Sequence, residues 1–137
     1  MRSPAVTALQ GALAAEHAAC WGYAVAGAHL SGSWQDAARQ DWAAHAMARD
    51  ALAGMIAARG QAPAAAQAFY RLPFPVRDAA SAKALAALLE DGVTRAYLGV
   101  VAVADLALRA FGAMAMQGPA QRAAFWRGST EAFPGMA

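Results

Sequence analysis

Two glutamates and one histidine are the residues of this sequence that could carry chemistry inside a protein. Glu16 lies on a stripe of mostly apolar residues that recur at alternating steps of four and three, which is the pattern of a helix facing a core. Glu90 lies on a similar stripe, and His45 falls on the apolar face of a segment between them. The chain has three glutamates in all, and charged side chains are ordinarily exposed. The pattern therefore predicts a buried polar network or a metal site.

The two stripes indicate which side chains would surround these three residues. The first comprises Leu9, Leu13, Glu16, Cys20, Tyr23, Gly27 and Leu30, and the second comprises Ala86, Glu90, Val93, Tyr97 and Val100. His45 is expected on one face with Trp42, Leu52 and Met55. Each inward glutamate precedes a tyrosine by seven residues, about two helical turns, and is followed directly by a titratable residue. The residues expected to complete a core polar network are Tyr23, Tyr97, His17, Asp91 and Cys20.

Two chemistries are compatible with this set. A single ion held by Glu16, His45 and Glu90 would have the two-carboxylate, one-histidine ligands that suit iron, manganese or zinc. In the other hypothesis His45 lies between the two carboxylates, the tyrosines donate to the remaining oxygens, and no metal is needed. The cofactor prediction is therefore either none or one Fe, Mn or Zn ion. The sequence has no glycine-rich phosphate loop, nucleophile elbow or catalytic-triad spacing, which favours a non-enzymatic protein.

The elements that would position these residues are helices. The chain has 137 residues, enough for a single domain over 1–137, and alanine, the best helix former, makes up about a third of it. Helices are expected over about 3–29, 33–59, 79–104 and 105–127, with Pro119 kinking or breaking the last near 116–118. A proline-rich link over 60–78 separates the second helix from the third. The predicted fold is all-α, an antiparallel four-helix bundle with a long crossover between helices two and three.

Several short motifs carry a family resemblance in their order and spacing. They are Ala-Ala-Glu16-His17-Ala-Ala, His45 before Arg49-Asp50-Ala-Leu52, Leu72-Pro-Phe-Pro75, Leu89-Glu90-Asp91, Phe-Trp126-Arg127 and Ala-Phe133-Pro-Gly. With these motifs the sequence resembles, over nearly its whole length, an actinobacterial ferritin-like family of unknown function, number 4439. The resemblance implies a ferritin-like four-helix fold and no known activity.

The wider ferritin-like superfamily allows a comparison of ligands. Its di-metal members place Glu on helices one and three and Glu-x-x-His on helices two and four. Glu16, His45 and Glu90 match three of those ligands, but the other positions hold Trp42 and Pro119, and the fourth helix has no Glu or His. The prediction is a degenerate, metal-free site in a protein with a binding or assembly role. The alternatives are a single-metal oxidoreductase or metal-binding protein, and a helical bundle that binds a small ligand.

Composition limits the partners and the compartment. The net charge is +2, Lys83 is the one lysine, and the arginines are scattered, so no nucleic-acid surface is expected. Cys20 is the one cysteine, which excludes an intrachain disulfide and favours a reducing cytoplasm. No uncharged apolar run is long enough to predict a membrane span. Because 59% of the residues are hydrophobic, exposed apolar area is expected, and with it a homodimer with tryptophan at the contact. Any small-molecule ligand stays unidentified.

Overall fold

The structure is a computed structural model that describes residues 2–128. Those residues form helices and no strand, which confirms the all-α prediction. The helices are α1 (Pro4–Gly27), α2 (Gly32–Ala58), α3 (Ala79–Val101), α4 (Leu106–Ala115) and α5 (Gln117–Arg127). The motif at Phe133 lies outside the described residues.

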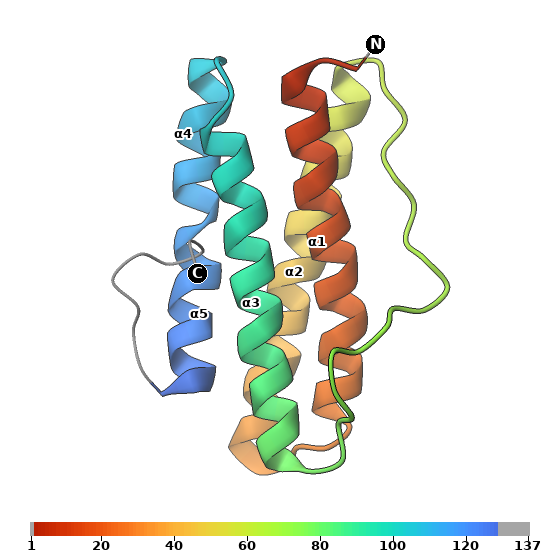
Figure 1. The fold of residues 1–137 in the computed structure, drawn as a ribbon, viewed down its shortest axis with the longest axis vertical. Coiled ribbons are helices and arrows are strands. Elements are labelled where there is room, and N and C mark those ends of the chain that lie inside the picture. The colour runs from red at the N-terminus through yellow and green to blue at the C-terminus, as the bar shows by residue number, and fades with distance from the viewer. Residues whose placement is uncertain (1, 129–137) are drawn as a thin grey trace.

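The helices pack side by side as a four-rod bundle in which α4 and α5 share one rod (Figure 1). α1 and α2 form an antiparallel hairpin, the crossover returns along the bundle, and α3 begins at the same end as α2 (Figure 1). α4 and α5 then run back along α3. Close backbone packing joins α1 to α2 and to α3, and α3 to α4 and α5. α2 has no comparable packing against α4 or α5, which leaves a seam between them.

The helix ends follow local capping chemistry. The Ser3 side chain accepts a hydrogen bond from the Val6 amide at the start of α1, where Pro4 takes the first helical position. At the start of α3 the Asp78 and Ser81 side chains each accept from the other residue's amide, which is a capping box. Gly60, with a φ of +76°, follows the end of α2 in the left-handed region that favours glycine. The predicted boundaries are thus confirmed to within a few residues.

The fourth rod is interrupted where the sequence predicts a break. α4 is capped by the Asp105 side chain, which accepts from the Leu108 amide, and it ends at Ala115. α5 begins one residue after Met116, so Pro119 occupies its first turn. Proline is tolerated there because an amide in the first turn has no intrahelical partner. The expected kink or break near 116–118 is confirmed.

The crossover over 60–78 is extended and attached to α1. The Gln10 side chain donates to the Ala62 carbonyl at 2.8 Å and accepts from the Ala64 amide at 2.8 Å, so it binds the crossover backbone as a strand would. Further along, Leu72 and Phe74 pack against the apolar core. A packed crossover is what the proline-rich sequence predicts.

The core consists of two apolar clusters with a polar layer between them. On α1, Leu9 and Leu13 belong to one cluster and Tyr23 and Ala26 to the other, with Glu16 between. Both predicted stripes are buried, including Glu16 and Glu90, except for the half-buried Gly27. Trp42 is the most exposed of the predicted inward residues, at 42%.

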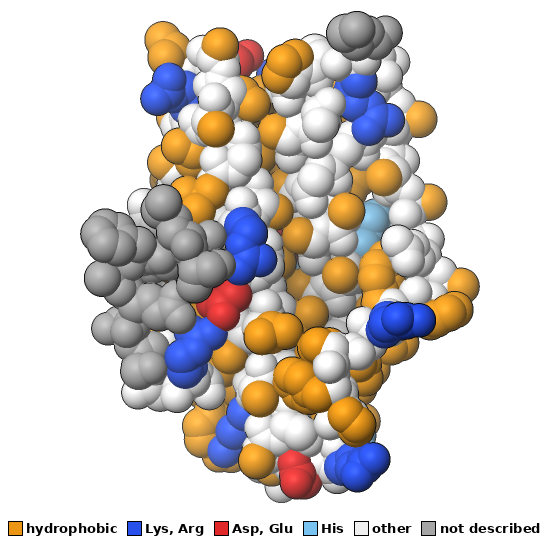
Figure 2. All heavy atoms as spheres, viewed as in Figure 1, with side chains coloured by type: hydrophobic (Ala, Val, Ile, Leu, Met, Phe, Trp, Pro, Cys, Tyr) orange, Lys and Arg blue, Asp and Glu red, His pale blue; other side chains and the backbone are white. Residues whose placement is uncertain are grey.

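The surface is sparsely charged. On the face shown in Figure 2, basic side chains are scattered among apolar ones and form no continuous stripe. Within the described residues, no helix combines the length and apolar character that crossing a bilayer requires.

Candidate functional site

The centre of the polar layer is an imidazole between two carboxylates. His45 Nδ1 lies 2.9 Å from Glu16 Oε2, and His45 Nε2 lies 2.9 Å from Glu90 Oε2. All three side chains are at most 1% exposed. They come from α2, α1 and α3, so three of the four rods converge on one ring. Both ring nitrogens can donate only when the imidazole is protonated, and the geometry suits that form.

Glu90 has two further donors on the same oxygen. The Arg122 Nε donates to Glu90 Oε2 at 3.0 Å, and the Tyr23 hydroxyl donates to it at 2.5 Å. Arg122 comes from α5, so the fourth rod also reaches the layer. Glu90 is therefore paired with two cationic side chains and a phenol. The four charged groups, two carboxylates and two cations, balance when His45 is protonated.

A second chain of hydrogen bonds extends the layer toward α5. The Tyr23 hydroxyl also lies 3.3 Å from Asp41 Oδ2, and that oxygen accepts from the Trp126 indole at 2.8 Å. The Tyr23 ring stacks on the His45 ring with 5.4 Å between centroids. These contacts fix the orientation of the imidazole and of the phenol.

The environment sets the protonation states. Burial alone would lower the pKa of His45, but the hydrogen bonds and charges of Glu16 and Glu90 outweigh it and raise the pKa from 6.5 to about 9. Burial, and then the charge of Glu90, raise the pKa of Tyr23, which therefore stays protonated as a donor. Burial also raises the pKa of Asp41, although the hydrogen bond from Trp126 partly lowers it. At neutral pH, His45 is thus an imidazolium.

A cavity of about 300 Å³ adjoins the Glu16 side of the layer. It lies in the seam between α2 and the α4–α5 rod, and its walls include Glu16, Tyr97 and Arg122. Glu16 Oε1 and Glu90 Oε1 are buried and have no hydrogen-bond partner within residues 2–128. Unpaired buried oxygens of this kind are uncommon in native proteins.

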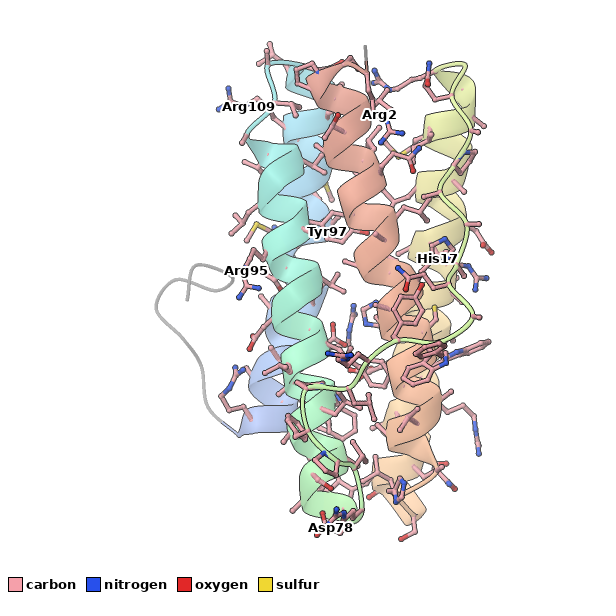
Figure 3. The ribbon with its side chains drawn as sticks, turned by 45° about the vertical axis from the view of Figure 1, so that its right-hand side comes forward. Arg2, His17, Asp78, Arg95, Tyr97 and Arg109 are labelled. Atoms are coloured by element: carbon pink, nitrogen blue, oxygen red, sulfur yellow. The ribbon has the colours of Figure 1, made fainter. Side chains whose placement is uncertain are left out.

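Two of the other predicted network residues lie close to the layer. Tyr97 is 2% exposed and reaches from α3 into the bundle (Figure 3). Burial and the charge of Glu16 raise its pKa, so the phenol is neutral beside that carboxylate. Cys20 is buried one turn from Glu16, and burial raises the pKa of its thiol.

His17 and Asp91 were predicted in the network, and the structure places them elsewhere. His17 Nε2 lies 2.9 Å from the Ala64 carbonyl, so this side chain holds the crossover (Figure 3). Asp91 forms an ion pair with Arg127. The reason is helical geometry, because neighbouring residues point about 100° apart and only one of them can face the core.

Three residues of the layer were not predicted from the sequence, namely Arg122, Asp41 and Trp126. Arg122 lies one helical turn after Pro119. Pro119 itself stands where a di-metal ferritin-like protein would have a metal ligand. The sequence did contain a signal for Arg122. The buried residues of α5 are Pro119, Ala123 and Trp126, and Arg122 is next to them on the helix surface. An arginine on such a face is a candidate partner for a buried carboxylate.

The fold and site define an all-α bundle protein with a buried Glu–His–Glu layer. Over residues 8–137 the sequence matches the family described as a domain of unknown function, DUF4439. The chain therefore belongs to that family, which confirms the resemblance. Its structure is similar to the crystal structure of a conserved hypothetical protein, rv2844, from Mycobacterium tuberculosis, with a TM-score of 0.88 and 31% identity. That similarity covers 93% of this chain and 98% of the mycobacterial chain. No curated protein matches the sequence.

Proposed function

We propose that this chain is a ferritin-like protein with a degenerate, metal-free central site and a binding or assembly role. The observation that carries the proposal is the position of His45, which donates to a different glutamate from each ring nitrogen. The order of elements supports the ferritin-like part, since two antiparallel pairs of rods joined by a long crossover are also found in ferritin-like bundles. The cations of the layer are then side chains rather than metal ions.

The residues do not fit a metal pair. Ferritin-like di-metal centres use ligands from all four helices, and two of those positions here are Trp42 and Pro119. Arg122 instead brings a guanidinium to within 3.0 Å of Glu90. A fixed positive charge at that distance would repel a cation bound to the same carboxylate.

A single-ion site, the basis of the metal-dependent alternative, has less support. The two glutamates bond to opposite nitrogens of one imidazole, so an ion bound to either nitrogen would displace one carboxylate and lie far from the other. Among residues 2–128, no group of three or more His, Cys, Asp or Glu side chains is arranged to hold a metal ion. This geometry favours the hydrogen-bonded network over a redox centre.

Metal analysis combined with melting curves tests the proposal. Protein purified without chelators should contain no stoichiometric iron, manganese or zinc. Adding each metal should leave the Tm of the wild type unchanged, or shift wild type and His45→Ala equally, because a ligand that binds the folded state raises its stability. A metal that raises the Tm of the wild type and not of His45→Ala would overturn the metal-free proposal.

For the assembly role, we propose a homodimer. Trp34 and Trp42 on α2 are 39% and 42% exposed, and Met47 on the same helix is 74% exposed. Large aromatic side chains at the surface are typical of interfaces. Light scattering at high micromolar concentration should give the mass of a dimer, and Trp42→Ala should shift it toward the monomer. A monomeric wild type would contradict this part of the proposal.

A further inference from the structure

The cavity beside Glu16 is a feature that the hydrogen-bonded layer does not use. Its volume, about 300 Å³, is at the lower end of the range for small-molecule sites. One wall comes from α2 and consists of small side chains such as Ala44 and Ala48. The facing wall contains Phe111 and Met114, and Met114 is 75% exposed at the opening. The body of the cavity is therefore apolar and accessible from solvent.

One wall of the cavity offers a hydrogen-bond acceptor. Glu16 is 1% exposed, and its Oε2 accepts from His45. Its Oε1 has no partner in the described part of the chain. Leaving a buried carboxylate oxygen unpaired is unfavourable, so a donor is needed there, which the neighbouring Tyr97 phenol, water or a ligand can supply.

Arg122 lines the same cavity and offers donors. Its Nε is used by Glu90, but a guanidinium has five N–H groups in all. The terminal nitrogens are held close to Gly118, where an added Cβ would lie 2.9 Å from Arg122 Nη1. A glycine at this position therefore leaves room for the guanidinium on the cavity wall.

We propose that this cavity binds a small apolar α-amino acid, with its ammonium group on Glu16 and its carboxylate on Arg122. The apolar side chain of the ligand would contact Phe111 and Met114. The charges of Glu16, Glu90, His45 and Arg122 balance among themselves, so a zwitterion adds no net charge beside them, whereas an amine or an acid alone would bring an unpaired charge into a partly buried site. This inference rests on the metal-free proposal, because an ion on Glu16 would occupy the acceptor.

Three probes with the same branched tail test the ligand class by calorimetry on the full chain. L-Leucine carries both charged groups, 3-methylbutylamine lacks the carboxylate, and 4-methylpentanoate lacks the ammonium group. Leucine should bind in a saturable manner. Each analogue should bind about tenfold more weakly or worse, since each loses a charge-assisted hydrogen bond.

Matched variants locate the site. Ala48→Leu fills the cavity and should abolish leucine binding, whereas Ala43→Leu, at an exposed position of the same helix, should bind like the wild type. Glu16→Gln should weaken leucine binding about tenfold, and Asp36→Asn, which removes an exposed carboxylate, should leave it unchanged. Melting curves of all four variants show whether each one is folded.

Three results would overturn the inference. They are no saturation of the wild type by leucine up to about 10 mM, unchanged binding in folded Ala48→Leu, and binding of 4-methylpentanoate as tight as that of leucine. The metal experiment separates this inference from the proposal on which it rests. If metals leave the Tm unaffected and leucine fails to bind, the ligand inference alone is wrong. If a metal stabilises the wild type and not His45→Ala, the metal-free site itself is wrong, whatever leucine does.

Discussion

The two buried glutamates are the same residue type on similar stripes, yet their surroundings differ. Glu90 Oε2 accepts hydrogen bonds from side chains of three other helices, α1, α2 and α5. Within the described residues, Glu16 Oε2 accepts from His45 alone, and the Glu16 side chain lines a cavity. The Oε1 atoms of both glutamates are unpaired within residues 2–128. Burial alone therefore does not determine what a carboxylate can do.

The difference arises from how the rods pack. α5 lies against α3, so Arg122 reaches Glu90 directly. The α2 backbone does not pack closely against that of α4 or α5, and the space left in that seam is where Glu16 meets the cavity. We interpret the Glu90 side of the layer as structural and the Glu16 side as the side available to a ligand.

Removing the shared imidazole should have the largest effect, because it affects both glutamates. His45→Ala would leave two buried carboxylates without their common cation, and breaking a buried ion pair costs about 3–5 kcal/mol. His45→Gln should cost less, since an amide still donates one hydrogen bond. Urea unfolding measures both free energies. If His45→Ala unfolds at the same urea concentration as the wild type, the layer contributes nothing.

The next effect is on the pH dependence of stability. The pKa of His45 is raised from 6.5 to about 9 in the folded protein, so the folded state binds the proton more tightly than the unfolded chain does. The resulting stabilisation, about 3 kcal/mol, is complete below pH 6.5 and is lost as the pH rises through about 9. Unfolding free energies across this range should show the loss in the wild type and not in His45→Gln. Parallel profiles for the two proteins would contradict it.

A double-mutant cycle compares the two glutamates directly. Arg122→Met and Glu90→Gln should show a coupling energy of about 1.5–3 kcal/mol, because the side chains share a charge-assisted hydrogen bond. The cycle of Arg122→Met with Glu16→Gln should give less than about 0.5 kcal/mol. Equal couplings would show that the two sides of the layer do not differ in the way described.

The smallest effect is expected at the edge of the layer. Trp126→Phe removes the indole donor to Asp41 and should cost about 1 kcal/mol in unfolding free energy. Phe69→Leu, at a surface position that is 70% exposed, is the control and should stay within about 0.5 kcal/mol of the wild type. A control variant as destabilised as Trp126→Phe would argue against a specific contribution of the indole.

Much of this arrangement follows from the sequence because it depends on local periodicity. The alternating steps of four and three placed Glu16 and Glu90 inward, and both are buried. Capping residues such as Asp78, together with Pro119, predicted where helices begin and where the last rod breaks. These features depend on neighbours within one or two helical turns.

The rest depends on contacts between distant segments. Asp41 meets Trp126 across 85 positions of sequence, and no period within either helix encodes that contact. Arg122 reaches Glu90 because α5 packs on α3, which the helix pattern alone does not specify. The cavity is harder still to predict from the sequence. It lies where the α2 backbone does not pack closely against α4 or α5.

The protonation state of His45 tests the central claim most directly, because the metal-free layer requires an imidazolium between two carboxylates. Nitrogen NMR of protein with isotope-labelled histidine reports each ring nitrogen separately, and His45→Gln assigns the signal. At about pH 7 both His45 nitrogens should be protonated, with the proton lost near pH 9. A neutral ring at pH 7, with one nitrogen bare or bound to an added metal ion, would contradict the claim.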